Sequence, residues 1–171
     1  MHNSKIDIAP SDNDYLDTLG SPYLAHFARR LADLIIEQGT TILLEKGMVT
    51  PSTALSTVFY LDNNQNVTVA CLANALSVSH QMATQRINSL IKLGLVTKGS
   101  SDKDKRAKYV VLTRKGKEEV KQLIPFVQNL ARAFEELESD LECQLTQVIR
   151  DAEKSLLETP LKERLSNLSG H

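Results

Sequence analysis

One stretch of the sequence, which begins at Thr68, constrains the fold most, because helix start and stop signals follow each other closely in it. Thr68 is suited to cap a helix over residues 69–76, and Ser79 is suited to cap a second helix. Only the pair Ser77-Val78 separates the two helices, and Gly94 is placed to end the second one. Two helices joined by so tight a break are typical of a helix-turn-helix.

A β-hairpin is predicted directly after these helices. Residues 95–98 and 108–112 are short runs with β-branched and aromatic character, and the charged stretch 100–106 between them is the predicted tip. A helix-turn-helix followed by a hairpin is a winged helix-turn-helix, which we expect over residues 50–113. The predicted fold class is therefore mainly α, an α+β winged helix whose β part is a two-stranded wing.

Further helices are predicted before this motif. Ser21-Pro22 and Thr50-Pro51 each place a capping hydroxyl before a proline, which predicts helices over residues 22–46 and 51–61. Gly47 is placed to end the first of them.

The chain after Thr113 is predicted to be helical again, with a kink or a break at Pro125. The spacing in Ser139-Asp140-Leu141-Glu142 is that of a capping box, so we expect it to open a last helix. Thr159-Pro160 is placed to end that helix.

The long terminal helices carry apolar stripes that need burial. We expect residues 21–47 and 114–171 to be dimerisation helices that pair with a second copy of the chain. Packing of these helices on the central domain of a monomer is the alternative. Residues 1–20 are expected to form a flexible N-terminal extension.

The charges of the chain are segregated. The whole sequence has a formal net charge of -1, from 20 Lys and Arg against 21 Asp and Glu. Residues 79–117 hold ten basic and two acidic side chains, a charge of +8, and the remainder carries −9. A basic block on an acidic body attracts a polyanion to one surface, although a solvated basic face without a partner is the alternative.

Several classes of protein are disfavoured by the sequence. No apolar run is long enough to span a bilayer, and two cysteines exclude a disulfide framework, so we expect a cytoplasmic protein without a membrane partner. The four histidines are scattered and no nucleophile elbow or glycine-rich phosphate loop occurs, so we expect no metal, no cofactor and no enzymatic activity.

The residues of the predicted helix-turn-helix and wing resemble those of a known family, the MarR family of bacterial transcriptional regulators. The resemblance to its helix-turn-helix is carried by Thr68-Val69-Ala70-Cys71-Leu72-Ala73, Ser79, Ile87, Leu90 and Gly94-Leu95-Val96. The resemblance to its wing and to its link between the first two helices is carried by Asp104-Lys105-Arg106, Val110-Val111-Leu112-Thr113, Gly116 and Gly47-Met48-Val49-Thr50-Pro51.

The resemblance covers about residues 21–157 and implies a homodimer of interlocked terminal helices that binds pseudo-palindromic operator DNA. It also implies repression of transcription and, as in many members, release of DNA when a small aromatic or anionic ligand binds. Cys71 departs from the family pattern, which commonly has an acidic residue there. We expect Cys71 and Cys143 to be packed, unreactive thiols and not redox sensors.

The helix that follows Ser79 is predicted to enter the major groove. At 100° per residue, Gln81, Gln85 and Asn88 lie opposite the apolar residues of this helix. An amide both donates and accepts hydrogen bonds, which suits the edge of adenine. The predicted DNA contacts of this helix are Ser79, His80, Gln81, Thr84, Gln85, Arg86 and Asn88, and Arg86 is expected to hold the DNA backbone.

The wing is predicted to supply a second set of contacts. Arg106 at the hairpin tip is suited to a narrow minor groove, and Asp104 is placed to orient it or to hold the turn. Lys103, Lys105 and Lys108 are expected to contact phosphates. A flexible charged turn is the alternative.

An effector site is predicted from aromatic and cationic residues in the first two helices, where family ligands often bind. The candidates are His26, Phe27, Arg30, Phe59 and Tyr60, which would suit a phenolic carboxylate. Core packing explains the aromatic residues equally well.

The sequence thus predicts a sequence-specific DNA-binding regulator that acts as a homodimer. The competing class is a winged-helix interaction module that uses its basic face on an acidic protein and binds no specific DNA.

Overall fold

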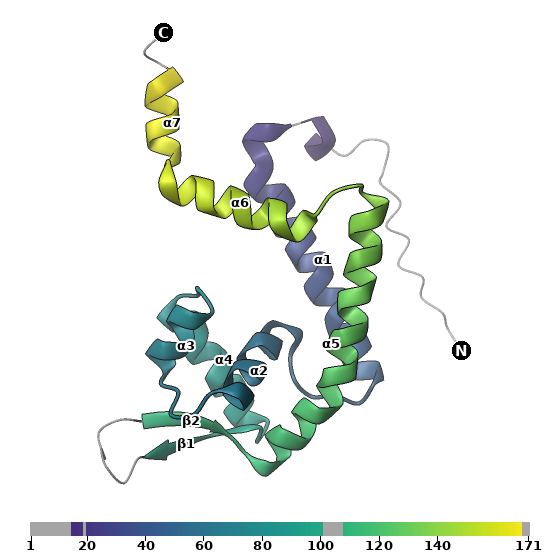
Figure 1. The fold of residues 1–171 in the computed structure, drawn as a ribbon, viewed down its shortest axis with the longest axis vertical. Helices are drawn as coiled ribbons and strands as arrows, with labels where there is room; N and C mark the ends of the chain where they lie inside the picture. Colours follow the sequence, from purple (N-terminus) through teal and green to yellow (C-terminus); the bar gives the residue numbers. More distant parts are fainter. Residues whose placement is uncertain (1–14, 19, 101–107, 169–171) are drawn as a thin grey trace. The chain divides into compact units, whose positions relative to one another are not determined.

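The computed structural model describes residues 15–18, 20–100 and 108–168 (Figure 1). The chain divides into a first unit that ends at Val120 and a second unit that begins at Lys121. The expectations for residues 1–14 and for the hairpin tip, residues 101–107, lie outside the described residues.

The first unit is a winged helix-turn-helix preceded by a long helix, so the predicted mainly α fold class is confirmed. Three short 3₁₀ turns accompany its helices. In chain order the elements are η1 (Tyr15–Thr18), η2 (Ser21–Tyr23), α1 (Leu24–Glu45), η3 (Ser52–Ala54), α2 (Leu55–Asn63), α3 (Val69–Ala75), α4 (His80–Lys92), β1 (Val96–Ser100), β2 (Lys108–Leu112) and the start of α5 (Arg114–Asp140).

The two caps predicted for the helix-turn-helix are confirmed. The Thr68 hydroxyl accepts a hydrogen bond of 3.1 Å from the Cys71 amide, and the Ser79 hydroxyl accepts one of 3.1 Å from the Met82 amide. Between the helices, Ser77 adopts a left-handed φ of 50°, which turns the chain within the short break. The geometry of the turn is therefore set by neighbouring residues, which is why the sequence predicts it well.

The two caps predicted before prolines are wrong. No side-chain cap occurs at Ser21-Pro22 or Thr50-Pro51, and in both places a 3₁₀ turn leads into the helix. The Thr50 hydroxyl instead donates to the buried carboxylate of Glu119 at 3.1 Å. A partner so far along the chain leaves no local signal in the sequence.

The wing is a two-stranded antiparallel sheet at the predicted positions. Val96 pairs with Leu112 and Lys98 pairs with Val110 in its register. The Val110 amide also donates to the Val67 carbonyl at 2.8 Å, so Val67, two residues before α3, forms an isolated β-bridge to the sheet. This bridge ties the wing to the beginning of the helix-turn-helix.

An apolar core joins the helices of the first unit to the sheet. Helices α1 to α4 and both strands contribute buried apolar side chains, so burial of apolar area holds them together. These side chains are Leu43, Val58, Leu61, Leu72, Ala83, Ile87, Leu90, Leu95, Val96, Val110 and Leu112. Because the inner side of α4 is buried here, its opposite side is exposed.

The start of α5 is packed tightly against the junction of α4 and β1. The Thr113 hydroxyl donates to the Gly94 carbonyl at 2.7 Å and accepts from the Gly116 amide at 3.0 Å. A methyl group at Gly116 would overlap the carbonyl oxygen of Leu95, so only glycine fits at this position. Helix α5 therefore begins on the backbone of the wing.

A buried carboxylate anchors the next turn of α5. One oxygen of Glu119 accepts hydrogen bonds from the Val49 amide at 2.7 Å, the Thr50 amide at 2.9 Å and the Thr50 hydroxyl. These donors lie in the link between α1 and η3, which has no helical hydrogen bonds of its own to satisfy them. The link thus depends on a side chain of α5.

The second unit contains the rest of α5, then α6 (Leu145–Glu158) and α7 (Leu161–Leu168). Of the kink or break expected at Pro125, the break is absent, since α5 continues to Asp140 with Pro125 inside it, and the kink stays a prediction. The capping box predicted from Ser139 to Glu142 is also wrong. Helix α6 starts later, and the Thr146 amide donates to the Glu138 carboxylate at 2.8 Å, which lowers the pKa of Glu138.

The predicted end of α6 at Thr159-Pro160 is confirmed, but the helix that follows it was not predicted. Apolar side chains of α1 and of α6 remain exposed on the single chain, and they include Leu34, Ile35, Val148 and Ile149. None of the helices in the described residues has the length and apolarity that crossing a bilayer requires.

Candidate nucleic-acid interface

The outer side of α4 presents amides to solvent. Gln81, Gln85 and Asn88 are exposed, while Ala83 and Ile87 on the other side are buried in the core. The amides lie on one side of the helix at spacings of four and three residues, as the sequence predicted. This surface combines donors and acceptors on a helix of 13 residues, which is the chemistry that base edges in a major groove require.

Two of the predicted contact residues use their hydroxyls within the helix. Ser79 accepts from the Met82 amide, and Thr84 donates to the His80 carbonyl at 2.8 Å. His80 itself is exposed at the start of the helix. Ser79 and Thr84 therefore shape α4, and their contact with DNA stays a prediction.

Basic side chains surround the end of α4. Lys92 lies in its last turn, Lys98 is exposed on β1, and the Lys115 ammonium donates to the Leu93 carbonyl at 2.9 Å. A cation at the C-terminus of a helix is favourable, because the last carbonyls have no partner within the helix. The positive charge predicted for this segment thus gathers where α4 meets the wing.

The wing residues expected to contact DNA are only partly described. Lys103, Asp104, Lys105 and Arg106 lie outside the described residues, and Lys108 is the first residue of β2. Their contacts with phosphates or with a minor groove stay predictions.

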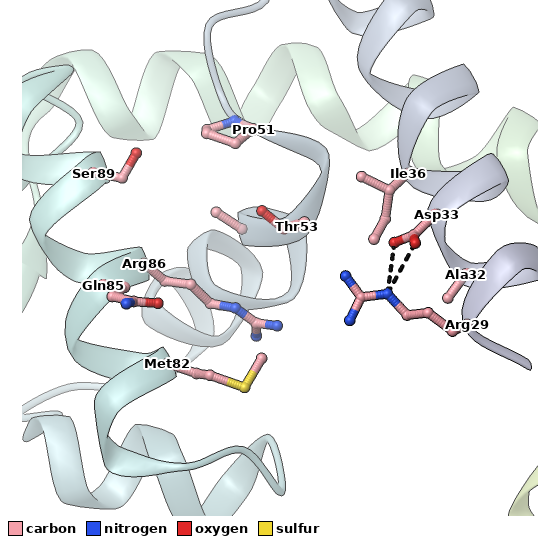
Figure 2. Close-up of a pocket in the computed structure, with 11 residues that line it drawn as sticks. Arg29, Ala32, Asp33, Ile36, Pro51, Thr53, Met82, Gln85, Arg86 and Ser89 are labelled. Atoms are coloured by element: carbon pink, nitrogen blue, oxygen red, sulfur yellow. Dashed lines mark hydrogen bonds and ion pairs between the residues drawn. The ribbon is translucent and has the colours of Figure 1, made fainter. Parts of the chain in front are cut away.

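A cavity of about 460 Å³ opens beside α4 and includes Gln85, one of the three exposed amides, in its lining. Its walls come from α1, from the turn before α2 and from α4 (Figure 2). The lining residues are Arg29, Ala32, Asp33, Ile36, Pro51, Thr53, Ala54, Met82, Gln85, Arg86 and Ser89.

Two guanidinium groups point toward each other across this cavity (Figure 2). Nε of Arg29 contacts both carboxylate oxygens of Asp33, at 3.0 and 2.9 Å, and this hydrogen bond raises the pKa of Arg29. Arg86 is half-buried, and its guanidinium forms no hydrogen bond or ion pair within the described part of the chain. The cavity thus offers positive charge beside the apolar side chains of Ile36 and Met82.

The residues predicted for an effector site do not line this cavity. His26 and Phe27 instead form an edge-to-face ring contact with centroids 5.9 Å apart, while Phe59 and Tyr60 are half-buried in α2. Arg30 is adjacent in sequence to the cavity residue Arg29 but lies about 100° around the helix. Arg29 and Asp33 both line the cavity, and their spacing of four residues was the one feature of the sequence that could have drawn attention to this side of α1.

The expectation that both cysteines are packed is wrong. Cys71 and Cys143 are free thiols on the exposed surface. The Thr68 hydroxyl lowers the pKa of Cys71 through a hydrogen bond. The described residues contain no group of three or more His, Cys, Asp or Glu side chains placed to hold a metal ion.

One family model matches part of the chain. Residues 46–107 match the model of the MarR family, while no curated protein matches the chain. A MarR/EmrR family transcriptional regulator from Acinetobacter sp. ADP1 has a TM-score of 0.64 at 16% identity, over 80% of this chain and 96% of its own.

Two further structures have the same fold. A MarR protein from Peptoclostridium difficile has a TM-score of 0.62 at 18% identity, over 86% of this chain and 93% of its own. The MepR–DNA complex of S. aureus has a TM-score of 0.59 at 17% identity, over 74% of this chain and 96% of its own. At these identities the similarity establishes the fold.

Proposed function

We propose that this chain, whose residues 46–107 match the model of the MarR family, is a transcriptional regulator that binds DNA through α4 and the wing. The observation that carries the proposal is the exposed row of amides on α4, next to a segment with a formal charge of +8. Support comes from MepR, a protein of the same fold that is solved in complex with DNA.

Helix α4 and the wing are proposed to contact different parts of the DNA. Gln81 and Gln85 read base edges in the major groove, with adenine as the preferred partner of a bidentate amide. Arg106 enters the adjacent minor groove, and Lys103 and Lys105 neutralise phosphates. Phosphate contacts position the protein, whereas the amides and Arg106 select the sequence.

The functional unit is proposed to be a homodimer that represses transcription by occupying an operator. Exposed apolar side chains on α1 and α6 supply the surface that a second copy would bury, with Leu34 and Val148 as examples. A two-fold symmetric dimer that reads two half-sites requires a pseudo-palindromic operator, with half-sites about 34–36 Å apart or a multiple of that distance.

The first test is the variant Arg106→Ala on an operator selected from genomic fragments. We expect the free energy of specific binding to fall by about 1–3 kcal/mol, because a sequence-selecting contact is lost. Fluorescence anisotropy at fixed salt measures this change, and the melting temperature should stay the same. Lys154→Ala, on the exposed surface of α6, is the matched control and should bind as the unmodified protein does.

The results of this test separate the two classes of function. Unchanged operator binding by Arg106→Ala contradicts the wing contact. If the unmodified protein binds every DNA sequence equally weakly, the interaction module is the better description.

The cavity beside α4 is proposed to take a small aromatic acid as effector. Arg86 and Arg29 would hold its carboxylate, while Ile36 and Met82 would contact the ring. Since Gln85 and Arg86 belong to the proposed reading helix, a ligand that binds DNA-free protein more tightly would release DNA.

The second test is the variant Arg29→Met, with benzoate as the probe and benzamide as its uncharged analogue. Loss of one charge-assisted hydrogen bond should weaken benzoate binding about 10- to 100-fold in calorimetry, and DNA binding without ligand should not change. Arg30→Met is the matched control, because Arg30 does not line the cavity. An equal loss in both variants, or equal binding of benzamide, contradicts the proposed site.

A further inference from the structure

Helix α4 and the wing are joined by short connections. Residues 93–95 lead from α4 into β1, and Thr113 alone leads from β2 into α5. In the proposed function α4 lies in the major groove while the wing reaches the adjacent minor groove. Both can bind at once only if the angle between them fits the DNA, so the residues that hold this angle also influence how the operator is read.

Thr113 binds the connection that enters the wing. Its hydroxyl donates to the Gly94 carbonyl at 2.7 Å, and its amide donates to the Leu95 carbonyl at 2.9 Å. The Gly94 carbonyl follows the last turn of α4, where no amide of that helix is left to satisfy it. The segment that enters the wing is therefore bound to the residue that leaves it.

The Thr113 hydroxyl also holds the start of α5. It accepts a hydrogen bond of 3.0 Å from the Gly116 amide, as the N-cap of a helix does. The ammonium of Lys115, in the same turn, donates to the Leu93 carbonyl at 2.9 Å. Thr113 thus has two separable tasks, because it caps α5 as an acceptor and links α5 to the end of α4 as a donor.

A second attachment of the wing lies further along β2. The Val110 amide donates to the Val67 carbonyl at 2.8 Å, ahead of α3. Two attachment points near one strand, at Val110 and at Thr113, define the direction in which this strand leaves the helices. The attachment at Val110 is made by backbone atoms, so Thr113 is the one that a side-chain substitution can release.

We propose that Thr113 is a positioning residue for DNA recognition, whose hydroxyl holds the wing at the angle to α4 that lets both contact one half-site. This inference rests on the proposed DNA-binding function. The single proton of the hydroxyl is engaged by the Gly94 carbonyl. Thr113 therefore acts through α4 and the wing, and not by donating to a base or a phosphate.

Three variants separate the capping of α5 from the positioning of the wing. Thr113→Ser keeps both the donor and the acceptor of the hydroxyl, Thr113→Asp keeps only an acceptor, and Thr113→Val keeps neither. Aspartate is a good N-cap, so Thr113→Asp should fold even if loss of the cap destabilises Thr113→Val.

The first readout is hydroxyl-radical footprinting of the operator at saturating protein. The unmodified protein and Thr113→Ser should protect the sugars beside the major groove of each half-site and those of the adjacent minor groove. Thr113→Asp and Thr113→Val should lose the minor-groove protection alone, with operator affinity about tenfold lower. Minor-groove protection that Thr113→Asp retains overturns the proposal, because a residue that only caps α5 gives this result.

Residual dipolar couplings of the DNA-free protein give the second readout. Measured on the amides of α4, β1 and β2, they report the angle between the helix and the sheet. This angle should change in Thr113→Asp and stay the same in Thr113→Ser. Couplings that are identical in all variants overturn the proposal.

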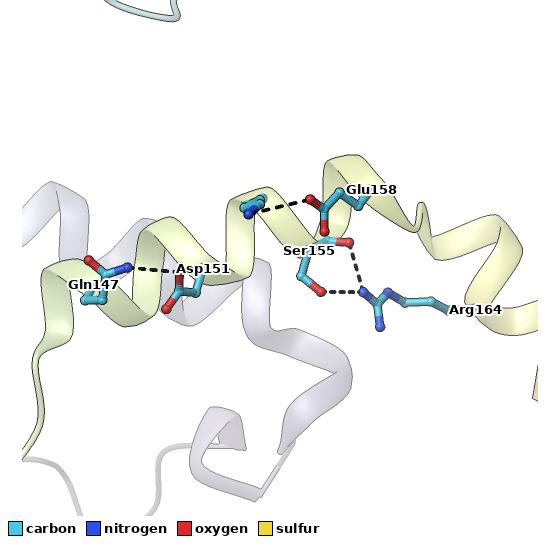
Figure 3. A network of polar contacts seen from close by, with 6 residues as sticks. Gln147, Asp151, Ser155, Glu158 and Arg164 are labelled. Carbon is cyan, nitrogen blue, oxygen red and sulfur yellow. Dashed lines mark hydrogen bonds and ion pairs between the residues drawn. The ribbon is translucent and has the colours of Figure 1, made fainter.

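A matched control removes a side-chain donor that links two other helices. Nη2 of Arg164, in α7, donates to the Ser155 hydroxyl of α6 at 2.6 Å (Figure 3). Arg164→Met removes this hydrogen bond and should leave the couplings of α4 and of the wing unchanged. Equal changes in Arg164→Met and Thr113→Asp contradict a specific role of Thr113.

The two readouts separate this inference from the proposed function. If no operator is bound but the angle changes in Thr113→Asp, Thr113 still sets the direction of the wing and the DNA-binding function fails. If the unmodified protein protects an operator and Thr113→Asp protects it in the same way, the DNA-binding function stands and the inference fails.

Discussion

Replacement of Glu119 by alanine is expected to lower the free energy of unfolding by about 3–5 kcal/mol. The substitution removes the acceptor of two amides and a hydroxyl, and the Thr50 donors are buried. Hydrogen bonds to a charged group contribute about 1.5–3 kcal/mol each, and buried donors left without a partner add their own cost. Urea denaturation followed by circular dichroism measures the loss.

Two further variants make this result specific. Glu119→Gln keeps one acceptor oxygen, so its loss should be smaller, about 1–2 kcal/mol. Glu135→Ala removes an exposed carboxylate from the same helix and should change stability by no more than about 0.5 kcal/mol. If Glu119→Ala is as stable as Glu135→Ala, the link between α1 and η3 does not depend on this carboxylate.

Gly116→Ala is expected to cost about 3 kcal/mol or more. The added methyl group would overlap the Leu95 carbonyl oxygen and would also crowd the Leu112 side chain. Overpacking in a core costs about 1–3 kcal/mol when side chains can adjust, and here the nearest atom is backbone. Chemical denaturation and the melting temperature should both report the loss.

Gly99→Ala is the control for this variant. A methyl group at Gly99 meets no atom within 4 Å, so its effect should stay within about 1 kcal/mol. Similar stabilities of the two alanine variants would contradict the close approach of α5 to the wing.

The helix-turn-helix and the wing could be predicted because their signals are local. Thr68 and Ser79 cap amides three residues away, and Gly94 adopts the left-handed φ of 72° that ends α4. The amide side of α4 followed from helical periodicity alone. Short-range chemistry thus accounts for the part of the fold that the family model also matches, within residues 46–107.

The predictions that are wrong involve hydrogen-bond partners that lie far away in the sequence or outside the predicted motif. The Thr50 hydroxyl binds Glu119, which is 69 residues away, and the amide that starts α6 uses Glu138 in place of the predicted capping box. Helix α7 is not predicted, because Thr159-Pro160 both ends α6 and directly precedes α7. The cavity was missed because its walls come from three segments that only the tertiary fold brings together.

Helix α4 serves two surfaces, because it carries the exposed amides on one side and lines the cavity with Met82, Arg86 and Ser89 on the neighbouring side. The same helix carries both surfaces, so a ligand in the cavity would lie directly against residues of the proposed reading helix. Thermodynamic linkage then makes the coupling reciprocal. In the proposed function, the factor by which an effector weakens operator binding would equal the factor by which the operator weakens effector binding, so the proposed regulator would detect the effector less sensitively when it is bound to DNA.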